Sequence, residues 1–149
     1  MKSFVLIKPD AMKRRLEQVI LNELKSLPCV ISKMKEVVVK EEVILKHYHE
    51  VIVRLNLPGF KEMILNEFKD QKVIILECES DDESLIQHIR TKIGATDPSL
   101  ADPSSIRGRY GEDSLALAKT SSRMIRNLIH ASDSVEAAEF ECDLWFNEA

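Results

Sequence analysis

The sequence predicts a mixed α/β (α+β) fold, because strand-like and helix-like segments alternate along its 149 residues. Two short apolar runs, Phe4 to Ile7 and Val73 to Leu76, are typical of buried β-strands. Between them, apolar residues recur three and four positions apart, which is typical of amphipathic helices. No repeat, low-complexity tract or Gly/Ser-rich linker divides the chain. We therefore expect a single domain over residues 1–149.

The individual elements follow from periodicity and from residues that break it. Pro9 stops the first strand and biases Lys8 towards an extended backbone. In the first half we expect strands over 3–8 and 29–39 and helices over 16–24, 43–55 and 60–68. In the second half we expect a strand over 72–79 and then a helix that is capped at Ser80 or Asp81 and ended by Gly94. A long loop should follow over 95–126. The chain should then form a short helix, opened by a capping box of Asp133 and Glu136, and a closing strand over 142–146. This order predicts a ferredoxin-like βαββαβ sandwich with a four-stranded antiparallel sheet and an inserted helical segment.

Composition narrows the classes of function. A formal net charge of −4 argues against general nucleic-acid binding, although a few converging cations can still hold a nucleotide. The apolar runs are too short to cross a membrane, and no signal peptide is visible. Three widely spaced cysteines without a CxxC pair are typical of a reduced cytoplasmic protein.

His130 is the leading candidate for chemistry. A neutral imidazole is a good phosphoryl acceptor near pH 7 when an acceptor orients its second nitrogen, and Glu141 is a candidate orienter. A single histidine beside a helix start is more often structural, so the assignment depends on its neighbours.

Three cations and one threonine are candidate phosphate ligands. Lys8 follows a strand end, and Arg107 lies in a loop beside a glycine, where its fork can take two phosphate oxygens. Arg90 and Thr96 flank the predicted helix end at Gly94. Each has an ordinary alternative, as a solvated lysine, a surface arginine, a cation at a helix C-terminus or a turn residue.

Other chemistries find little support. His47 and His49 are two apart, so on a helix they point to different faces and do not share a metal ion. No Cys/His cluster has ligand spacing, and neither a phosphate-binding GxxxxGK[ST] loop nor a G-x-S-x-G serine motif is present. We therefore assign no metal ligand.

Five segments together resemble the nucleoside diphosphate kinase family over nearly the whole chain. They are FVLIKPDA from Phe4 to Ala11, His47-Tyr48, IGATDP from Ile93 to Pro98, SIRG from Ser105 to Gly108, and NLIHASDS from Asn127 to Ser134 with the following Glu141 and the Leu144-Trp145-Phe146 run. The resemblance implies that a phosphoryl group moves from a nucleoside triphosphate, mainly ATP, to a nucleoside diphosphate by a ping-pong mechanism.

The resemblance also implies roles for single residues. His130 is implied as the nucleophile that becomes phosphohistidine, with Glu141 bound to its ring and Ser132 close by. Lys8 and Tyr48 are implied beside the transferred phosphate. The implied nucleotide-binding set is Lys8, Asn56, Arg90, Thr96, Arg107 and Asn127. Members of the family use Mg²⁺ that is carried with the nucleotide, and they are usually hexamers or tetramers.

The chain departs from the family in several places, among them Arg15 and Gln18, which stand where glycines are common. Asn56 stands where an aromatic residue stacks on the base, which predicts weaker nucleotide affinity unless a neighbour such as Leu57 replaces it. Arg109 stands where an acidic residue is usual, and an extra segment of about Gly111 to Ser122 lies in a loop that helps subunits meet. Alternatives to an enzyme are a non-catalytic interaction module with the same fold and a nucleic-acid-binding regulator. The first is disfavoured because every polar catalytic position implied by the resemblance carries the expected residue type, and the second because the net charge is negative.

Overall fold

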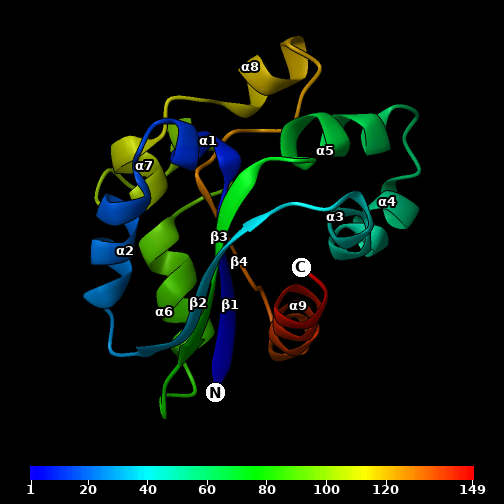
Figure 1. The fold of residues 1–149 in the computed structure, drawn as a ribbon. Coiled ribbons are helices and arrows are strands. Elements are labelled where there is room, and N and C mark those ends of the chain that lie inside the picture. The colour runs from blue at the N-terminus through cyan, green and yellow to red at the C-terminus, as the bar shows by residue number, and fades with distance from the viewer.

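The computed structural model describes residues 1–149 and contains one four-stranded antiparallel sheet (Figure 1). The strands are β1 Lys2–Ile7, β2 Val30–Val38, β3 Lys72–Glu79 and β4 Ile129–Ala131. Their order across the sheet is β2-β3-β1-β4, with β1 paired to both β3 and β4. This is the order of a split βαβ sandwich, so the predicted ferredoxin-like fold is confirmed.

Helices cover both faces of this sheet, as the two sides of Figure 1 show. The helices are α1 Pro9–Lys13, α2 Glu17–Lys25, α3 Glu41–His47, α4 His49–Leu55, α5 Phe60–Phe68, α6 Leu85–Ile93, α7 Ile106–Tyr110, α8 Leu115–Thr120 and α9 Val135–Glu148, with a short 3-10 helix over Pro98–Leu100. One core cluster packs α2 and α6 against the sheet, and the other packs α3, α5 and α9 against its opposite face. The strands alternate between the clusters, because Val5 and Ile7 belong to the first and Phe4 and Leu6 to the second.

The closing strand predicted over 142–146 is wrong, since these residues lie in α9. Ser134 caps that helix by accepting a hydrogen bond from the backbone N–H of Ala137. The helix buries Ala138, Glu141, Cys142 and Trp145 at helical spacing. The closing strand is instead β4, which is only three residues long and therefore leaves almost no periodic pattern.

Three further sequence expectations are corrected by the structure. The loop predicted over 95–126 contains a 3-10 helix, α7 and α8, whose N-caps Asp97, Ser105 and Ser114 each accept a backbone hydrogen bond. Helix α6 begins at Leu85 after an N-cap at Ser84, not at residues 80 or 81. The helix expected over 43–55 is divided at Tyr48 into α3 and α4. The predicted stop at Gly94 is confirmed, because α6 ends at Ile93 and Gly94 follows with a positive φ of 96°, which favours glycine.

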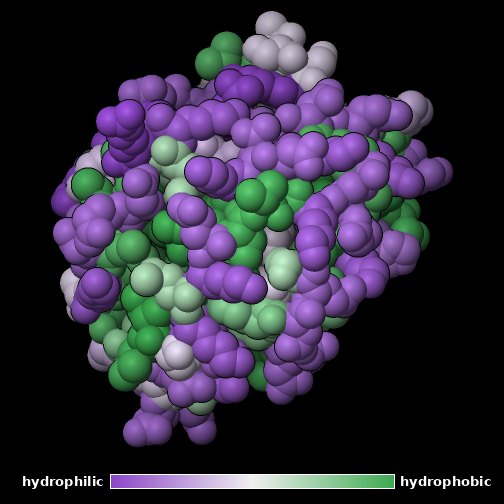
Figure 2. Space-filling model, in the orientation of Figure 1, coloured by the Kyte–Doolittle hydropathy of each residue, from purple (hydrophilic) through white to green (hydrophobic).

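The edge strand β2 exposes apolar side chains. In Figure 2 most of the surface is hydrophilic, but hydrophobic residues gather across the middle of this face, where β2 lies in Figure 1. Val30, Met34 and Val38 on β2 are exposed by 67%, 57% and 51%. An uncovered edge with this character is a ready surface for association. None of the helices has the length and apolar character needed to cross a membrane.

Candidate active site

A cavity of about 390 Å³ opens where β1 ends and β4 begins, beside the junction of α3 and α4. Eight of the residues singled out in the sequence line it, namely Lys8, Tyr48, Arg90, Thr96, Arg107, Asn127, His130 and Glu141. They come from stretches of chain that are far apart in sequence, and only the antiparallel pairing of β4 with β1 brings the two ends together. These eight residues bring a histidine, a carboxylate and three cations to one end of the sheet, and His47, Glu50 and Asp133 also line the cavity.

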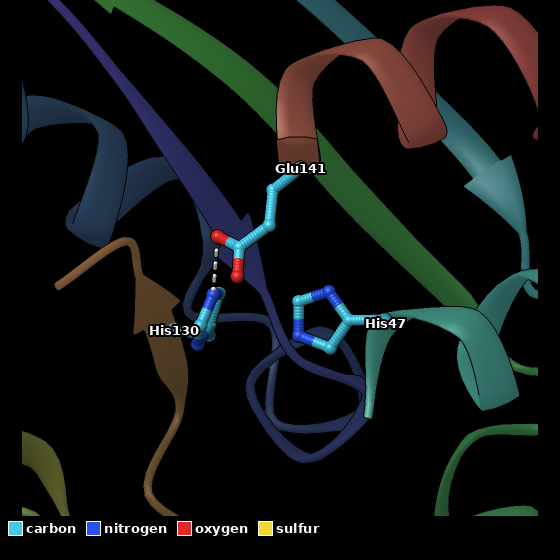
Figure 3. Close-up of side chains that lie close together, drawn as sticks. All are labelled: His47, His130 and Glu141. Atoms are coloured by element: carbon cyan, nitrogen blue, oxygen red, sulfur yellow. Dashed lines mark hydrogen bonds and ion pairs between the residues drawn. The ribbon is translucent and has the colours of Figure 1, made fainter. Parts of the chain in front are cut away.

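His130 is oriented by Glu141. It lies in the middle of β4, opposite Leu6 of β1, so its side chain points to the face covered by α9. Its Nε2 atom is 2.9 Å from Oε1 of Glu141 (Figure 3). An ionised carboxylate only accepts hydrogen bonds, so Nε2 carries the proton and, in the neutral ring, Nδ1 carries the lone pair.

Glu141 is held in its charged form. Burial alone would raise the pKa of this carboxyl, but the hydrogen bond from His130, the nearby imidazoles and the hydroxyl of Ser132 hold it below its usual range. Ser132 is fully buried, and its hydroxyl donates to the same Oε1 at 2.7 Å. Ser132 therefore acts on the carboxylate and does not line the cavity itself.

Lys8 is a buried cation at the end of β1. Its side chain is almost fully enclosed, and its Nζ donates to the carbonyl of Ile125 at 2.9 Å and to Oδ1 of Asn127 at 2.8 Å. Burial, with a smaller repulsion from Arg107, lowers the pKa of Lys8 to about 8, although Asp10 opposes the shift. Asn127 donates in turn to the carbonyl of Thr96 at 3.0 Å. One short network thus holds three of the candidate nucleotide ligands.

Arg107 joins two segments of backbone through three carbonyls. From α7 its guanidinium donates to the carbonyls of Asn127 at 3.2 Å, Gly94 at 3.0 Å and Ile129 at 2.6 Å. Burial and the nearby Arg90 lower the pKa of Arg107 to about 10, so it stays charged at neutral pH. Arg90 reaches the same edge from α6, with a long 3.4 Å contact to the carbonyl of Ala131. Both guanidinium groups line the cavity.

Tyr48 stands at the break between α3 and α4. Burial and the charge of Glu141 raise the pKa of its hydroxyl, so the group remains a neutral donor. Asn56, by contrast, is exposed, lies outside the cavity lining and ends α4 in a left-handed conformation with φ of 44°. Asparagine tolerates that conformation better than most residues. The structure thus places Asn56 in the turn that ends α4, apart from the residues that line the cavity.

His47 is the neighbour of His130 that spacing alone did not reveal. One ligand-type atom from each of His47, His130 and Glu141 lies within 4.8 Å of the others, so this trio is the set of side chains best placed to hold a metal ion. His49 is exposed and takes no part in the cluster. The two histidines are 83 residues apart in the sequence, so no local spacing pointed to the contact.

Comparisons with known proteins identify the family. The family model described as nucleoside diphosphate kinase matches residues 1–149. The chain belongs to this family. Among curated relatives, a nucleoside diphosphate kinase of Methanosphaera stadtmanae is 34% identical over 147 residues, which are 99% of this chain and 86% of that protein. One of Methanothermobacter thermautotrophicus is 35% identical over 148 residues, covering 99% and 88%.

Solved structures of nucleoside diphosphate kinases share the fold. A transition state mimic of the Borrelia burgdorferi enzyme with bound vanadate and ADP superposes with a TM-score of 0.90 at 26% identity, covering 99% of this chain and 88% of the other. A halophilic enzyme from Halobacterium salinarum in complex with CDP gives a TM-score of 0.80 at 29% identity, with the same coverage.

The stretch from Gly111 to Ser122 is anchored by Asp113. This buried carboxylate accepts two hydrogen bonds from Arg123, at 2.6 and 3.0 Å, and one from the backbone N–H of Arg126 at 2.8 Å. Arg126 also binds Glu67 at 2.7 Å. These contacts close the base of α8 and fix the start of the stretch that leads to Asn127.

Asp113→Asn should make the free energy of unfolding less dependent on pH in the acid range. The hydrogen bonds from Arg123 lower the pKa of Asp113 to about 2. Because the folded pKa lies below the unfolded value of about 3.9, this stabilisation is present above about pH 4 and is lost as the pH falls towards 2. Urea unfolding should show a wild-type advantage on the order of 2 kcal/mol at pH 6 that shrinks towards pH 2. Glu112→Gln is the control, since Glu112 is 76% exposed and should change little. A constant difference across the range would contradict the assignment.

Proposed function

We propose that this chain is a nucleoside diphosphate kinase, which transfers the γ-phosphoryl group of a nucleoside triphosphate, mainly ATP, to a nucleoside diphosphate through a phosphohistidine at His130. The observation that carries this proposal is the 2.9 Å contact between Nε2 of His130 and Glu141. It commits one ring nitrogen to the carboxylate, while Nδ1 makes no hydrogen bond to the protein.

The first half-reaction follows from this arrangement. The lone pair of Nδ1 attacks the γ-phosphorus, a nitrogen–phosphorus bond forms, and the bond to the bridging oxygen breaks with its electron pair leaving on the diphosphate. Charge spreads over the phosphoryl oxygens in the transition state, so positioned cations lower the barrier. Lys8, Arg90 and Arg107 line the cavity for that task, and Tyr48 offers a neutral donor.

The second half-reaction is the reverse with a different diphosphate. A terminal oxygen of the incoming nucleotide attacks the phosphorus, and the nitrogen–phosphorus bond breaks as its electron pair returns to Nδ1. Glu141 accepts the hydrogen bond from Nε2 throughout, which keeps the ring in one tautomer. One site thus serves donor and acceptor in turn, which predicts ping-pong kinetics.

Mg²⁺ enters this proposal with the nucleotide. The cavity residues that would face the phosphates, Lys8, Arg90 and Arg107, are donors only and cannot ligate a cation. Mg²⁺ is usually held by one or two carboxylates together with substrate phosphates, and when bound it neutralises phosphate charge. The donor set here therefore fits a nucleotide that carries its own ion, and no protein ligand is assigned.

A two-step labelling experiment tests the function. Protein incubated with ATP labelled in the γ-phosphate, without acceptor, should become labelled and release ADP. After removal of ATP, added GDP or CDP should take the label from the protein. Protein that transfers phosphate only while ATP is still present would contradict a phosphoenzyme mechanism.

The pH dependence of kcat/KM should report on Lys8. Because burial lowers the pKa of Lys8 to about 8, the free enzyme loses this charge as the pH rises through 8. We expect kcat/KM to fall above that pH, approaching about tenfold per unit, because kcat/KM follows the protonation of the free enzyme. Lys8→Met should have low activity without that descent. A flat wild-type profile from pH 7 to 9.5 would contradict the shifted pKa.

Association and location are proposed on separate observations. The apolar, uncovered edge of β2 supports a homo-oligomer, for which a hexamer or a tetramer is expected from the family. Sizing of the purified protein with and without Met34→Lys tests this surface, since a charge at its centre should shift the chain towards monomer. Free thiols at Cys29, Cys78 and Cys142 support a reducing, cytoplasmic compartment.

A further inference from the structure

We propose that His47 is a positioning residue for the reaction. A hydrogen bond from Trp145 holds the His47 ring so that its N–H is turned towards the face of the His130 ring. The acceptor imidazole is thus restrained at its face by His47 and at its edge by Glu141. This proposal rests on the proposed phosphoryl transfer, but the state of His47 can be measured without any activity. Three observations carry it.

The first observation is the hydrogen bond from Trp145. Its indole Nε1 donates to Nδ1 of His47 at 3.0 Å, from a side chain that is fully buried in α9. An indole nitrogen can only donate, so Nδ1 of His47 must carry a lone pair. In a neutral imidazole the proton then resides on Nε2. The other neutral tautomer, with the proton on Nδ1, would place two N–H groups against each other and leave the Trp145 donor without a partner.

The second observation is the contact between the two imidazoles. The rings of His47 and His130 have centroids 4.7 Å apart and cross at 80°. Figure 3 shows the far nitrogen of His47 directed towards His130, whose ring is seen edge-on and presents its face to His47. An N–H directed at an aromatic face is a weak attraction that favours one orientation. Glu141 holds the edge of the same ring, so both tilt and rotation of His130 are restricted.

The third observation separates this role from metal binding. His47, His130 and Glu141 are close enough to form a ligand set. However, a metal ion on Nε2 of His47 would require the proton on Nδ1, where a bound histidine normally donates to an acceptor. Here Nδ1 faces the N–H of Trp145. The tautomer set by Trp145 therefore favours an N–H donor at this position over a metal ligand.

The surroundings of His47 keep it neutral. Burial first, then the imidazole of His130 and the charge of Lys8, lower the pKa of His47 to about 3, while Glu141 opposes the shift. These are the charged or titratable groups that face it from β4, β1 and α9. A ring that stays neutral presents the same N–H to His130 over the whole pH range in which the protein works.

Nitrogen NMR of the histidine rings tests the tautomer directly. We expect His47 to show a protonated Nε2 and an unprotonated Nδ1 from pH 5 to pH 9, with no titration. In Trp145→Phe, which keeps an aromatic ring but removes the N–H, we expect a mixture of tautomers. A protonated Nδ1 in the wild type, or titration near neutrality, would overturn the proposal. This readout stands even for a protein that fails the labelling experiment, so the two proposals can fail separately.

Kinetics test whether the contact matters for transfer. His47→Phe should lower kcat roughly 10- to 100-fold with little change in nucleotide KM, because misplacing the acceptor affects the reacting geometry more than binding. His47→Gln, which can present an amide N–H, should recover part of that loss at a similar melting temperature. His49→Gln is the matched control, because His49 is exposed and outside the cluster. Unchanged kcat in His47→Phe, or zinc inhibition that His47→Gln relieves, would overturn the proposal.

Discussion

His130→Ala is expected to lose phosphoryl transfer by at least about 10⁴-fold, because the lone pair of the other cavity imidazole, on Nδ1 of His47, already accepts a hydrogen bond from Trp145. The loss should appear in kcat and not only in KM, since Lys8, Arg90 and Arg107, which we propose to hold the phosphates, remain in place. The covalent label from ATP should disappear completely. Coupled assays of ATP against several diphosphates measure the first effect, and labelled ATP measures the second.

His88→Ala is the matched control for this experiment. His88 is a surface histidine on α6, 44% exposed and 3.5 Å from Asp82, and it should keep wild-type transfer and wild-type label. If His130→Ala retained its label while His88→Ala lost it, the assignment of the acceptor would be wrong.

Arg107→Lys should damage both stability and catalysis although it keeps the charge. Arg107 donates to three carbonyls in two separate segments, around Gly94 and over 127–129, and a lysine cannot reproduce the planar geometry of these hydrogen bonds. Leaving one or two buried carbonyls unpaired costs about 1–3 kcal/mol each. We expect the free energy of unfolding to fall by about 2–4 kcal/mol and kcat/KM to fall by roughly 10²- to 10³-fold.

Arg109→Lys controls for the Arg107 variant. Arg109 is two residues away on the same short helix, is half exposed and pairs with Glu23 on the surface. It should change the free energy of unfolding by less than about 0.5 kcal/mol. Denaturant unfolding and steady-state kinetics, measured side by side for the two variants, compare their free energies of unfolding and their kcat/KM. Equal effects at the two positions would contradict the special role of Arg107.

Much of the fold could be predicted from periodicity, and the failures have physical causes. The strand over 72–79 matches β3, because it is buried on both faces and reads as a continuous apolar run. The strand β4 escaped detection because three residues cannot show a period. The run around Trp145 looked like a strand because its apolar residues are consecutive, yet they lie in α9, which buries Leu144 and Trp145 and leaves Phe146 half-buried against the same core. Short helices in the long loop are held by caps and tertiary contacts more than by pattern.

The site could be predicted only in part. Lys8, Arg107 and His130 have no sequence relationship that reveals their meeting, and the resemblance to the family supplied it. The cavity lining is consistent with that expectation for eight positions and places Asn56 outside. The pairing of His47 with Trp145 was invisible because it depends on α9 being a helix, which the sequence pattern concealed. The wrong prediction of a strand over 142–146 and the failure to foresee the contact between His47 and Trp145 thus have the same cause.

The most direct test is the location of the phosphoryl group on the protein. Phosphoenzyme prepared with ATP and analysed by phosphorus–nitrogen NMR should show phosphorus on Nδ1 of His130, with the proton retained on Nε2. That result is predicted because Glu141 occupies the Nε2 side of the ring at 2.9 Å. Phosphorus on Nε2, on another residue, or absent after full exposure to ATP would contradict the account.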